Sequence, residues 1–309
     1  MGRQAQANAF VPLPIRDGVS PSYLWLKDGS WSAMLPFLAE NFPDVSEADW
    51  AARLLRGEVV DGEGVALRAD TPYRRGMRIW YYRELEGETP IPFEEAIIFR
   101  DEHLLVVDKP HFLPVIPSGR FLHQTLLVRL KKKFDLPQLT PIHRLDRETA
   151  GVVIFSHCLD SRGAYQSLFQ KRSVEKVYEA LAAPLRGVQA PLVHRSRMVE
   201  GEPFFCMREA EGEPNSETLI EVIEQRADAT LYRLRPHTGR QHQLRVHMSA
   251  LGSPILNDGF YPVALPCKGD DFRHPLQLLA RSIGFPDPLT GERRYFESAR
   301  ALTLDLDPE

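Results

Sequence analysis

The spacing of hydrophobic positions changes near residue 90 and predicts two folded regions. Before this point, apolar residues recur at helical spacing in Ser30–Phe42 and again in Glu47–Leu55, which predicts two helices. Ser46, followed three residues later by Asp49, resembles a capping box at the start of the second helix. Alternating apolar residues then predict a strand within Thr71–Tyr82.

From residue 96 onward, short apolar or alternating runs dominate, and this pattern is typical of β-strands. Helical spacing recurs in Leu122–Phe134 and Leu159–Arg172, whereas the polar stretch Gly187–Pro214 predicts loops and short hairpins. Several strands with a few inserted helices indicate an α+β fold on a mixed, mostly antiparallel sheet. The predicted strands are Ile97–Phe99, Leu104–Val107, Val152–Phe155, Glu175–Ala182, Thr218–Glu224 and Thr230–Arg235.

The boundary between the two regions is predicted at a proline-containing stretch. Gly87–Phe93 holds two prolines where the hydrophobic pattern changes, so we interpret residues 87–95 as a linker. The sequence therefore predicts an extended arm over residues 1–21, a small α+β domain over residues 22–86 and a larger domain over residues 96–309.

The larger domain contains an unusual charged run, Pro141–Ser156, with the sequence P-I-H-R-L-D-R-E-T-A-G-V-V-I-F-S. Its apolar end predicts a buried strand, so its charged part lies in the loop that leads into that strand. Asp146, flanked by Arg144 and Arg147, is expected to be held ionised and oriented there. The run is a candidate nucleophile or base, and an ordinary loop ion pair explains it equally well.

A second charged run, Arg235–Gly252, contains three arginines and three histidines. Thr238 is a predicted N-cap, and Gly252 follows Leu251 at the predicted end of the helix. The histidines are five residues apart and do not converge on one helix face, so we predict no metal site. In the functional interpretation, one arginine faces inward and holds a carboxylate, and the others contact phosphate. In the alternative interpretation, the arginines are solvated on a surface helix.

Charge and composition narrow the setting of the protein. The net charge of −4 is not typical of a strong nucleic-acid binder. Residues 1–95 hold 10 Lys and Arg against 15 Asp and Glu, and residues 96–309 hold 28 against 27. No apolar run approaches the ~20 residues of a membrane span, and Met1–Val11 lacks the apolar core of a secretory signal. The cysteines are widely spaced, so we expect a reducing, cytoplasmic location; they are Cys158, Cys206 and Cys267.

Several motifs in a fixed order resemble the RluA-type pseudouridine synthase family. They are D-K-P from Asp108, H-R-L-D-x-x-T-x-G from His143, K-x-Y-x-A from Lys176, and T-G-R-x-H-Q-L-R-V-H-M from Thr238, followed by L-G-x-P-I. The likeness covers roughly residues 97–297. The two helices, the glycines and the strand before residue 83 are also similar to the alpha-L RNA-binding module, named after a small-subunit ribosomal protein.

The resemblance implies an enzyme that isomerises uridine in RNA to pseudouridine, with residues 96–309 as its catalytic domain. Asp146 matches the catalytic aspartate of the family, Tyr178 the tyrosine near the uracil, and Arg245 the basic residue paired with the aspartate. Arg144 matches an arginine that fills the gap left by the flipped base. The resemblance also implies a set of substrate-binding residues: His143, Thr149, Arg240, His242, Gln243, Leu276 and Leu278.

The resemblance further implies the partners of the protein. The expected partner is structured RNA, either ribosomal or transfer RNA. No membrane, metal or cofactor is expected, and the protein is expected to be a monomer. The sequence has no P-loop, no dinucleotide fingerprint and no H-E-x-x-H motif. Two positions depart from the family pattern: Ala150 stands where serine is usual, and Leu279 replaces a histidine. Neither departure removes a proposed catalytic residue.

Two other functions stay open at this point. A non-catalytic RNA-binding or ribosome-assembly protein would retain the fold without needing Asp146, Tyr178 and Arg245. A glycoside-type hydrolase would pair Asp146 with Glu148. A spacing of two residues in a loop does not reliably place two carboxylates on one substrate, which disfavours the hydrolase.

Overall fold

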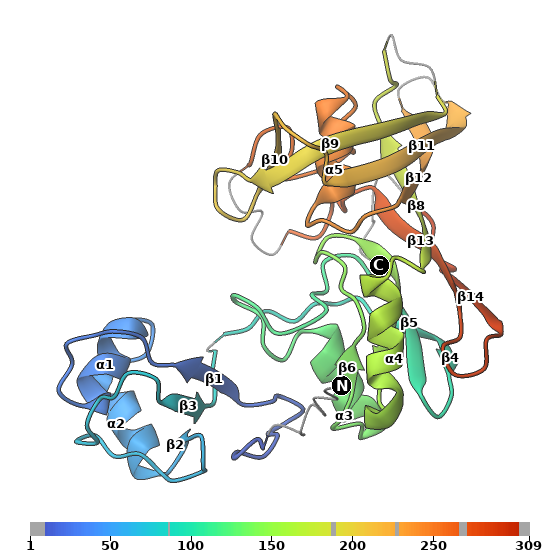
Figure 1. Cartoon of the computed structure of the whole chain (residues 1–309). Coiled ribbons are helices and arrows are strands. Elements are labelled where there is room, and N and C mark those ends of the chain that lie inside the picture. Colours follow the sequence, from blue (N-terminus) through green and yellow to red (C-terminus); the bar gives the residue numbers. More distant parts are fainter. Residues whose placement is uncertain (1–9, 86, 187–189, 226–228, 266–270, 303–309) are drawn as a thin grey trace. The chain divides into compact units, whose positions relative to one another are not determined.

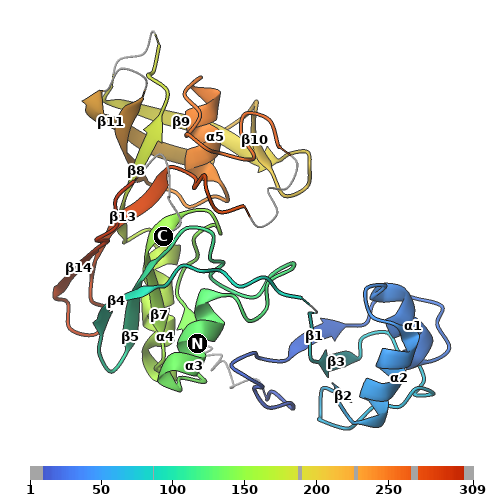
Figure 2. The same cartoon turned by 180° about the vertical axis from the view of Figure 1, so that it is seen from behind.

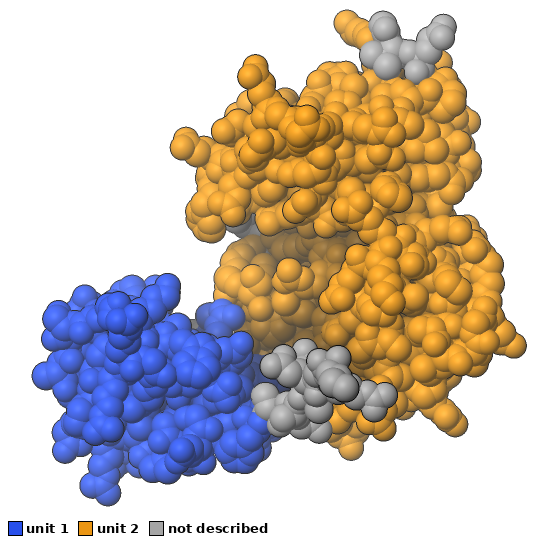
Figure 3. Space-filling view, in the orientation of Figure 1, with its two compact units in different colours: residues 1–88 blue, residues 89–309 orange. Residues whose placement is uncertain are grey.

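The computed structural model describes residues 10–85, 87–186, 190–225, 229–265 and 271–302. It divides the chain into two compact units, residues 1–88 and 89–309 (Figure 3). The expectation about Met1–Val11 lies almost wholly outside the described residues, and Cys267 lies outside them. In the described part of the chain, no helix has the length and apolar character needed to cross a membrane.

Unit 1 is a three-stranded antiparallel sheet with two helices packed on one face. The sheet order is β1-β3-β2. Ser46 accepts a hydrogen bond from the Asp49 N–H at 3.1 Å, so the predicted cap of the second helix is confirmed. The core between sheet and helices includes Met34, Leu38, Trp50 and Ile79. The elements are β1 (Ser22–Trp25), α1 (Met34–Asn41), α2 (Glu47–Leu55), β2 (Val59–Asp61) and β3 (Arg78–Tyr81).

Unit 2 is built on one long sheet, and the expected mixed, mostly antiparallel α+β fold is confirmed. Its strand order is β10-β9-β11-β12-β8-β13-β7-β5-β4, with β14 beside β13 and β6 beside β7. The strands are β4 (Ala96–Arg100), β5 (Leu104–Lys109), β6 (Thr140–Pro141), β7 (Ala150–Ser156), β8 (Glu175–Ala182), β9 (Leu192–Glu200), β10 (Met207–Ala210), β11 (Ser216–Gln225), β12 (Thr230–Pro236), β13 (Leu278–Pro286) and β14 (Arg293–Glu297). The helices are α3 (Leu126–Phe134), α4 (Leu159–Gln170) and α5 (Gln243–Ala250).

The sheet of unit 2 has two halves that meet at a short parallel contact. β13 pairs with β7 in parallel through only two residue pairs, whereas the other pairings are antiparallel. Figures 1 and 2 show β9–β12 with α5 on one side of this contact and β4–β7 with α3 and α4 on the other. Gly151 lies at the contact with φ +113°, and a Cβ there would collide with the Ala280 backbone. The join therefore requires glycine at this position.

The continuous apolar runs of β5 and β7 are explained by burial on both faces. On one face, Val107 and Val153 pack with Leu126 and Leu130 of α3. On the other face, the alternate residues, such as Val152, pack in a cluster that includes Tyr165 and Leu168 of α4. This double packing fixes β7, and with it the position of the charged loop that precedes the strand.

One sequence expectation for unit 2 was right only in part, and a second was wrong. Gly187–Pro214 contains an expected hairpin, since β9 pairs antiparallel with β10, but β9 (Leu192–Glu200) is a nine-residue strand that also pairs with β11 and joins the main sheet. α3 begins at Leu126 and not at Leu122, because Thr125 adopts an extended conformation and accepts a hydrogen bond from the Val128 N–H as the N-cap. In both cases long-range pairing or a local cap overrides the hydrophobic pattern.

Candidate active site

A cleft of about 670 Å3 opens between the two halves of unit 2 (Figure 3). The loop before β7, strand β8 and the segment 236–245 line it. Leu276 is the predicted site residue that does not line the cleft, and it is buried in the core cluster against which Tyr178 packs. The predicted residues that line the cleft are His143, Arg144, Asp146, Thr149, Tyr178, Arg240, His242, Gln243, Arg245 and Leu278.

The backbone around Asp146 is tied down while its side chain stays 31% exposed in the cleft. Arg147 Nε donates a 3.0 Å hydrogen bond to the Phe112 carbonyl. The buried Lys109 Nζ donates to the Arg147 carbonyl at 3.0 Å. The Thr149 N–H closes a turn onto the Asp146 carbonyl at 3.2 Å. These contacts hold the loop so that one carboxylate is presented to the cleft.

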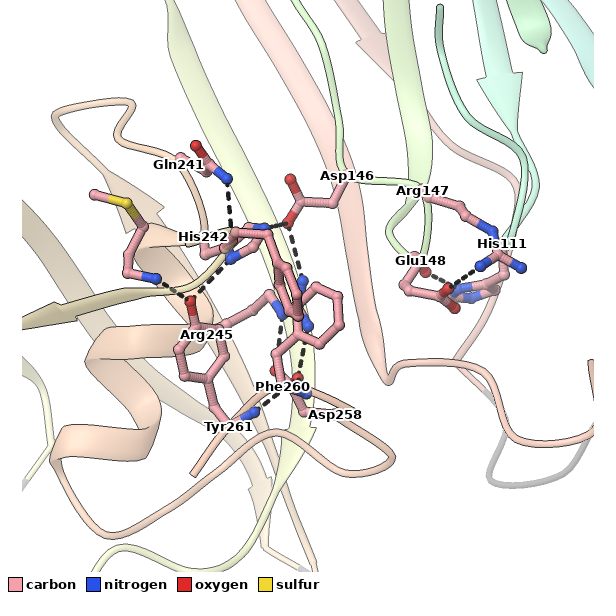
Figure 4. Close-up of polar contacts among 12 residues, drawn as sticks. His111, Asp146, Arg147, Glu148, Gln241, His242, Arg245, Asp258, Phe260 and Tyr261 are labelled. Atoms are coloured by element: carbon pink, nitrogen blue, oxygen red, sulfur yellow. Dashed lines mark hydrogen bonds and ion pairs between the residues drawn. The ribbon is translucent and has the colours of Figure 1, made fainter. Parts of the chain in front are cut away.

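Arg245 joins two carboxylates from different parts of the chain (Figure 4). Its Nε and Nη2 bind the two oxygens of Asp258 at 2.8 and 2.6 Å, which is a bidentate pair. Its remaining Nη1 lies 3.3 Å from Asp146 Oδ2. The side chains of Arg245 and Asp258 are 2% and 1% exposed, and the Phe260 ring centre lies 4.7 Å from the guanidinium carbon. Asp258 therefore aims Arg245 at Asp146.

The charge of Arg245 is fixed by its surroundings. Burial alone would lower the pKa of Arg245, but the hydrogen bonds and charge of Asp258, together with the charge of Asp146, raise it. The guanidinium is therefore a permanent cation beside Asp146. We did not predict Asp258 from the sequence, because an Asp followed by Gly259 has the composition of an ordinary turn.

His242 approaches Asp146 from the same side as Arg245 (Figure 4). Its Nε2 lies 3.8 Å from Asp146 Oδ2, and its Nδ1 lies 2.8 Å from the Tyr261 hydroxyl. The Met207 N–H donates to that hydroxyl at 2.8 Å, which leaves the phenol proton for Nδ1. Burial lowers the pKa of His242, so the ring is neutral. The tautomer that satisfies these groups carries its proton on Nε2, toward Asp146.

Tyr178 and Lys176 place a phenol and an amine in the cleft from strand β8. Burial, and secondarily the charge of Asp146, raises the pKa of Tyr178, which keeps its hydroxyl protonated. Lys176 Nζ donates to the Thr238 carbonyl at 3.2 Å, and burial lowers its pKa to about 8. The cleft thus combines one carboxylate with several cations and a neutral phenol, an arrangement suited to an anionic substrate.

Comparisons with known proteins agree with this arrangement. Residues 103–250 match the family model described as RNA pseudouridylate synthase. The dual-specificity RNA pseudouridine synthase RluA of Vibrio parahaemolyticus is 34% identical over 245 residues, which are 73% of this chain and 94% of that protein. The chain belongs to the RluA-type pseudouridine synthase family. It is an RNA pseudouridine synthase, an enzyme that isomerises uridine in RNA.

Two further similarities concern the length of the chain and its fold. An uncharacterized RNA pseudouridine synthase of Synechocystis is 27% identical over 289 residues, covering 89% of this chain and 94% of that protein. The solved structure of human RNA pseudouridylate synthase domain containing 1 aligns with a TM-score of 0.55 at 25% identity, over 67% of this chain and 84% of that one. The likeness therefore extends from the motifs to the fold.

The loop before α5 of the synthase is held by Gln243, and the prediction of Thr238 as a helix cap was wrong. The helix begins at Gln243, after His242 in the left-handed conformation with φ 54°. The Thr238 hydroxyl donates to Gln243 Oε1 at 2.6 Å, and Gln243 Nε2 donates to the Glu217 carbonyl at 2.9 Å. Both groups of the amide bond within the protein, so Gln243 shapes the cleft wall. Arg240, by contrast, is exposed at the rim.

His143 anchors the loop that carries Asp146. Its Nε2 accepts a hydrogen bond from the Ile154 N–H at 3.1 Å, and its ring stacks on Phe169 at 4.9 Å between centres. Burial, and then the charge of Lys176, lowers the pKa of His143 to about 3. The ring is therefore neutral and accepts from the backbone, and it fixes the start of the charged run against β7.

The histidines of the second charged run do not gather in the synthase. His247 instead lies near His194 and Glu209, with ligand-type atoms within 4.8 Å of one another. Both nitrogens of His247 already meet hydroxyls, at 2.9 Å from Ser216 and 2.9 Å from Thr218. This group is a hydrogen-bonding cluster that joins α5 to β11.

Substitution of Lys109 is expected to loosen the Asp146 loop of the synthase. Lys109 Nζ is fully buried and donates to the carbonyls of Pro110, Leu113 and Arg147. Lys109→Met would leave these carbonyls without donors, so we expect a loss of about 2–4 kcal/mol in the free energy of unfolding. Urea unfolding measures this loss of stability. Lys132→Met, at an exposed position, serves as the control. An unchanged unfolding midpoint for Lys109→Met would show that Lys109 does not hold the Asp146 loop.

Proposed function

We propose that this synthase converts specific uridines of ribosomal or transfer RNA to pseudouridine by base flipping, with Asp146 as the nucleophile. The observation that carries the proposal is the pair of Asp146 and Arg245 across the cleft, at 3.3 Å. Among the described residues that line the cleft, Asp146 is the only carboxylate. A monomer that acts in the cytoplasm without a cofactor belongs to the same proposal.

The hydrolase alternative is disfavoured by the position of Glu148. Glu148 Oε1 pairs with Arg147 Nη1 at 3.3 Å, and the side chain does not line the cleft. Figure 4 shows Glu148 turned toward Arg147 and His111, away from Asp146. Hydrolysis by paired carboxylates needs both groups on one substrate, which this arrangement does not offer.

The proposed reaction begins with extrusion of the uridine from its stack. Leaving the stack costs a few kcal/mol, which contacts in the cleft must offset. Arg144 is exposed beside Asp146 and has no hydrogen bond or ion pair with another described residue, so its side chain is available to fill the vacated space. Arg240, an exposed residue that also lines the cleft, is proposed to meet phosphate.

Asp146 would then act on the anomeric carbon. The bond from this carbon to uracil N1 breaks with oxocarbenium character, which a carboxylate stabilises by bonding or by charge. The uracil turns, and its carbon 5 bonds to the anomeric carbon as any bond from that carbon to Asp146 breaks and the carboxylate is released. Carbon 5 then loses its proton and N1 gains one. Arg245 and the Nε2 proton of His242 orient Asp146 throughout.

Tyr178 is proposed to take part in removal of the carbon 5 proton. In the free enzyme the negative charge of Asp146 is one of two causes that raise the pKa of Tyr178. Any bond between Asp146 and the anomeric carbon must break before carbon 5 can bond there, so Asp146 is ionised again when carbon 5 loses its proton. Because Tyr178 is protonated, it can take that proton only as it passes its own to another group, and the ionised Asp146, whose charge acts on Tyr178, is the proposed acceptor.

Tyr178→Phe is expected to slow the late step by roughly 10²–10⁴-fold, because the phenol oxygen is lost while the ring remains. Single-turnover release of tritium from carbon 5 measures this step. Tyr295→Phe, at an exposed position, is the matched control. Unchanged single-turnover kinetics in Tyr178→Phe would remove this residue from the mechanism.

The RNA target can be found by a search that assumes no particular uridine. Pseudouridine is mapped across all RNA in a strain lacking the gene and in its parent, with the wild-type and Asp146→Asn genes returned to the deletion strain. Positions in ribosomal or transfer RNA that depend on the gene and on Asp146 are the expected result. Restoration by Asp146→Asn would show that Asp146 is not the nucleophile, and an RNA pseudouridine pattern independent of the gene would favour a non-catalytic RNA-binding role.

A further inference from the structure

The sheet of unit 1 leaves part of its outer face uncovered. Residues before β1 cover one part, because Leu13 packs with Val60, Trp80 and Tyr82. The neighbouring part carries Tyr23 and Trp25 of β1, which are 56% and 55% exposed. These two side chains share a face because they are two residues apart on one strand.

Tyr23, Trp25, Arg78 and Trp80 together form what we call the aromatic face. Tyr23 lies opposite Trp80 and Trp25 opposite Arg78 in the β1–β3 register. The Tyr23 and Trp80 rings are 4.9 Å apart between centres. The Arg78 guanidinium carbon lies 5.6, 5.4 and 4.8 Å from the ring centres of Tyr23, Trp25 and Trp80. The guanidinium is thus held among three rings by cation–π contacts.

The aromatic face carries a positive charge with no acidic partner. Among the described residues, Arg78 has no ion pair with a carboxylate, and the same is true of Arg68 and Arg74. Four other arginines of unit 1 do have one, namely Arg16, Arg53, Arg56 and Arg75. The contrast matters because residues 1–95 have 15 acidic against 10 basic side chains, so carboxylates are plentiful in this part of the chain. An unpaired guanidinium beside exposed rings suits a ligand that has both a flat surface and a negative charge.

We propose that the aromatic face binds unpaired nucleotides of the substrate RNA, outside the part that enters the cleft, by stacking of bases on Tyr23 and Trp25. Unpaired bases stack on aromatic rings and on guanidinium planes, and arginine can also meet the adjoining phosphate. Paired bases do not present their faces in this way. The inference rests on RNA being the substrate, and it does not depend on Asp146 being the nucleophile.

Tryptophan fluorescence reports on unit 1 and not on the cleft. The four tryptophans of the chain all lie in unit 1, and none of the described residues lining the cleft is a tryptophan. We expect a uridine-rich single-stranded RNA 12-mer to quench the fluorescence of the full chain, and the matching duplex to leave it nearly unchanged. Trp25→Phe should lose most of the quenching and keep its affinity for the 12-mer within about twofold. Equal quenching by the duplex would overturn the proposal.

Steady-state kinetics with RNA as substrate tests whether the aromatic face contributes to RNA binding. The full-length double variant Tyr23→Ala/Trp25→Ala is expected to raise KM for carbon-5-tritiated total RNA from a deletion strain by about 10–100-fold, with kcat unchanged. Leu55→Ala, at a position 89% exposed in the same unit, is the control. Tyr23→Leu/Trp25→Leu keeps apolar area without stacking and should resemble the alanine variant. Tyr23→Phe/Trp25→Phe keeps stacking and should retain the wild-type KM.

The outcomes separate this inference from the catalytic proposal. A normal KM in the folded alanine or leucine variant would overturn RNA binding at the face. Sedimentation that shows a wild-type dimer, dissociated in those variants, would assign the face to a second copy of the chain and also overturn it. Asp146→Asn should retain full quenching by the 12-mer. Normal pseudouridine formation by that variant would reject the nucleophile and leave the result for the face standing.

Discussion

Asp146→Asn is expected to lower pseudouridine formation by roughly 10⁴-fold or more, with RNA affinity within about threefold of wild type. The amide is nearly the same size as the carboxylate, so the loop tethered by Lys109 and Arg147 should keep its shape. The amide lacks the charge and nucleophilicity that the anomeric carbon requires. The expected loss therefore lies in the chemical step and not in binding.

Single-turnover assays with tritiated RNA and filter binding measure the two properties separately. Glu148→Gln is the matched control, because it makes the same chemical change two residues away on a side chain outside the cleft. We expect it to retain activity within about threefold. Substantial turnover by Asp146→Asn, or an equal loss in Glu148→Gln, would contradict Asp146 as nucleophile.

Asp258→Ala is expected to destabilise the fold by about 3–5 kcal/mol and to abolish activity, because it leaves the buried Arg245 guanidinium without its bidentate partner. The nearby carboxylate of Asp146 cannot replace the pair, since it meets only Nη1 at 3.3 Å. Urea unfolding measures the stability. Asp271→Ala serves as the control, because it breaks an ion pair in which the two side chains are 69% and 37% exposed, and it should leave the midpoint nearly unchanged.

A double variant distinguishes loss of the pair from loss of the fold. Arg245→Met with Asp258→Leu removes both charges and fills similar volume, so stability should return close to that of the wild-type enzyme. Activity should not return, because the guanidinium that bonds to Asp146 is then absent. Recovery of activity in this variant would show that Arg245 only supports the structure.

The sequence predicted well those elements whose signals are local. Helix α2 and strand β8 have the bounds expected from spacing, and Ser46 caps α2 as expected. In each case a run of nearby residues carries both the pattern and the hydrogen bonds that realise it. The order of the motifs also led to the family, because each motif is a short segment that does not need the tertiary structure to be recognised.

The predictions from the sequence were wrong or incomplete where residues distant in the chain determine the local structure. Thr238 has the composition of a helix cap, but its hydroxyl bonds to Gln243 and to the Glu217 N–H of a neighbouring strand. The helix therefore starts later. Polar side chains of β9 bond to polar side chains of β10 and β11, so the segment lacked an apolar signal; the pairs are His194–Glu209, Arg195–Glu217 and Ser196–Ser216. Asp258 could not be assigned because its role exists only once Arg245 is buried beside it.

Because the two sides of the cleft come from distant parts of the chain, the active site can form only after both parts have been synthesised. Asp146 and Arg245 are 99 residues apart in the chain, and protein synthesis adds about 5–20 residues per second. A ribosome therefore needs roughly 5–20 s after the Asp146 loop to deliver Arg245, and a little longer to deliver Asp258. During this interval the nascent chain holds the aspartate without its cation, so uridine isomerisation can begin only near the end of synthesis of this unit.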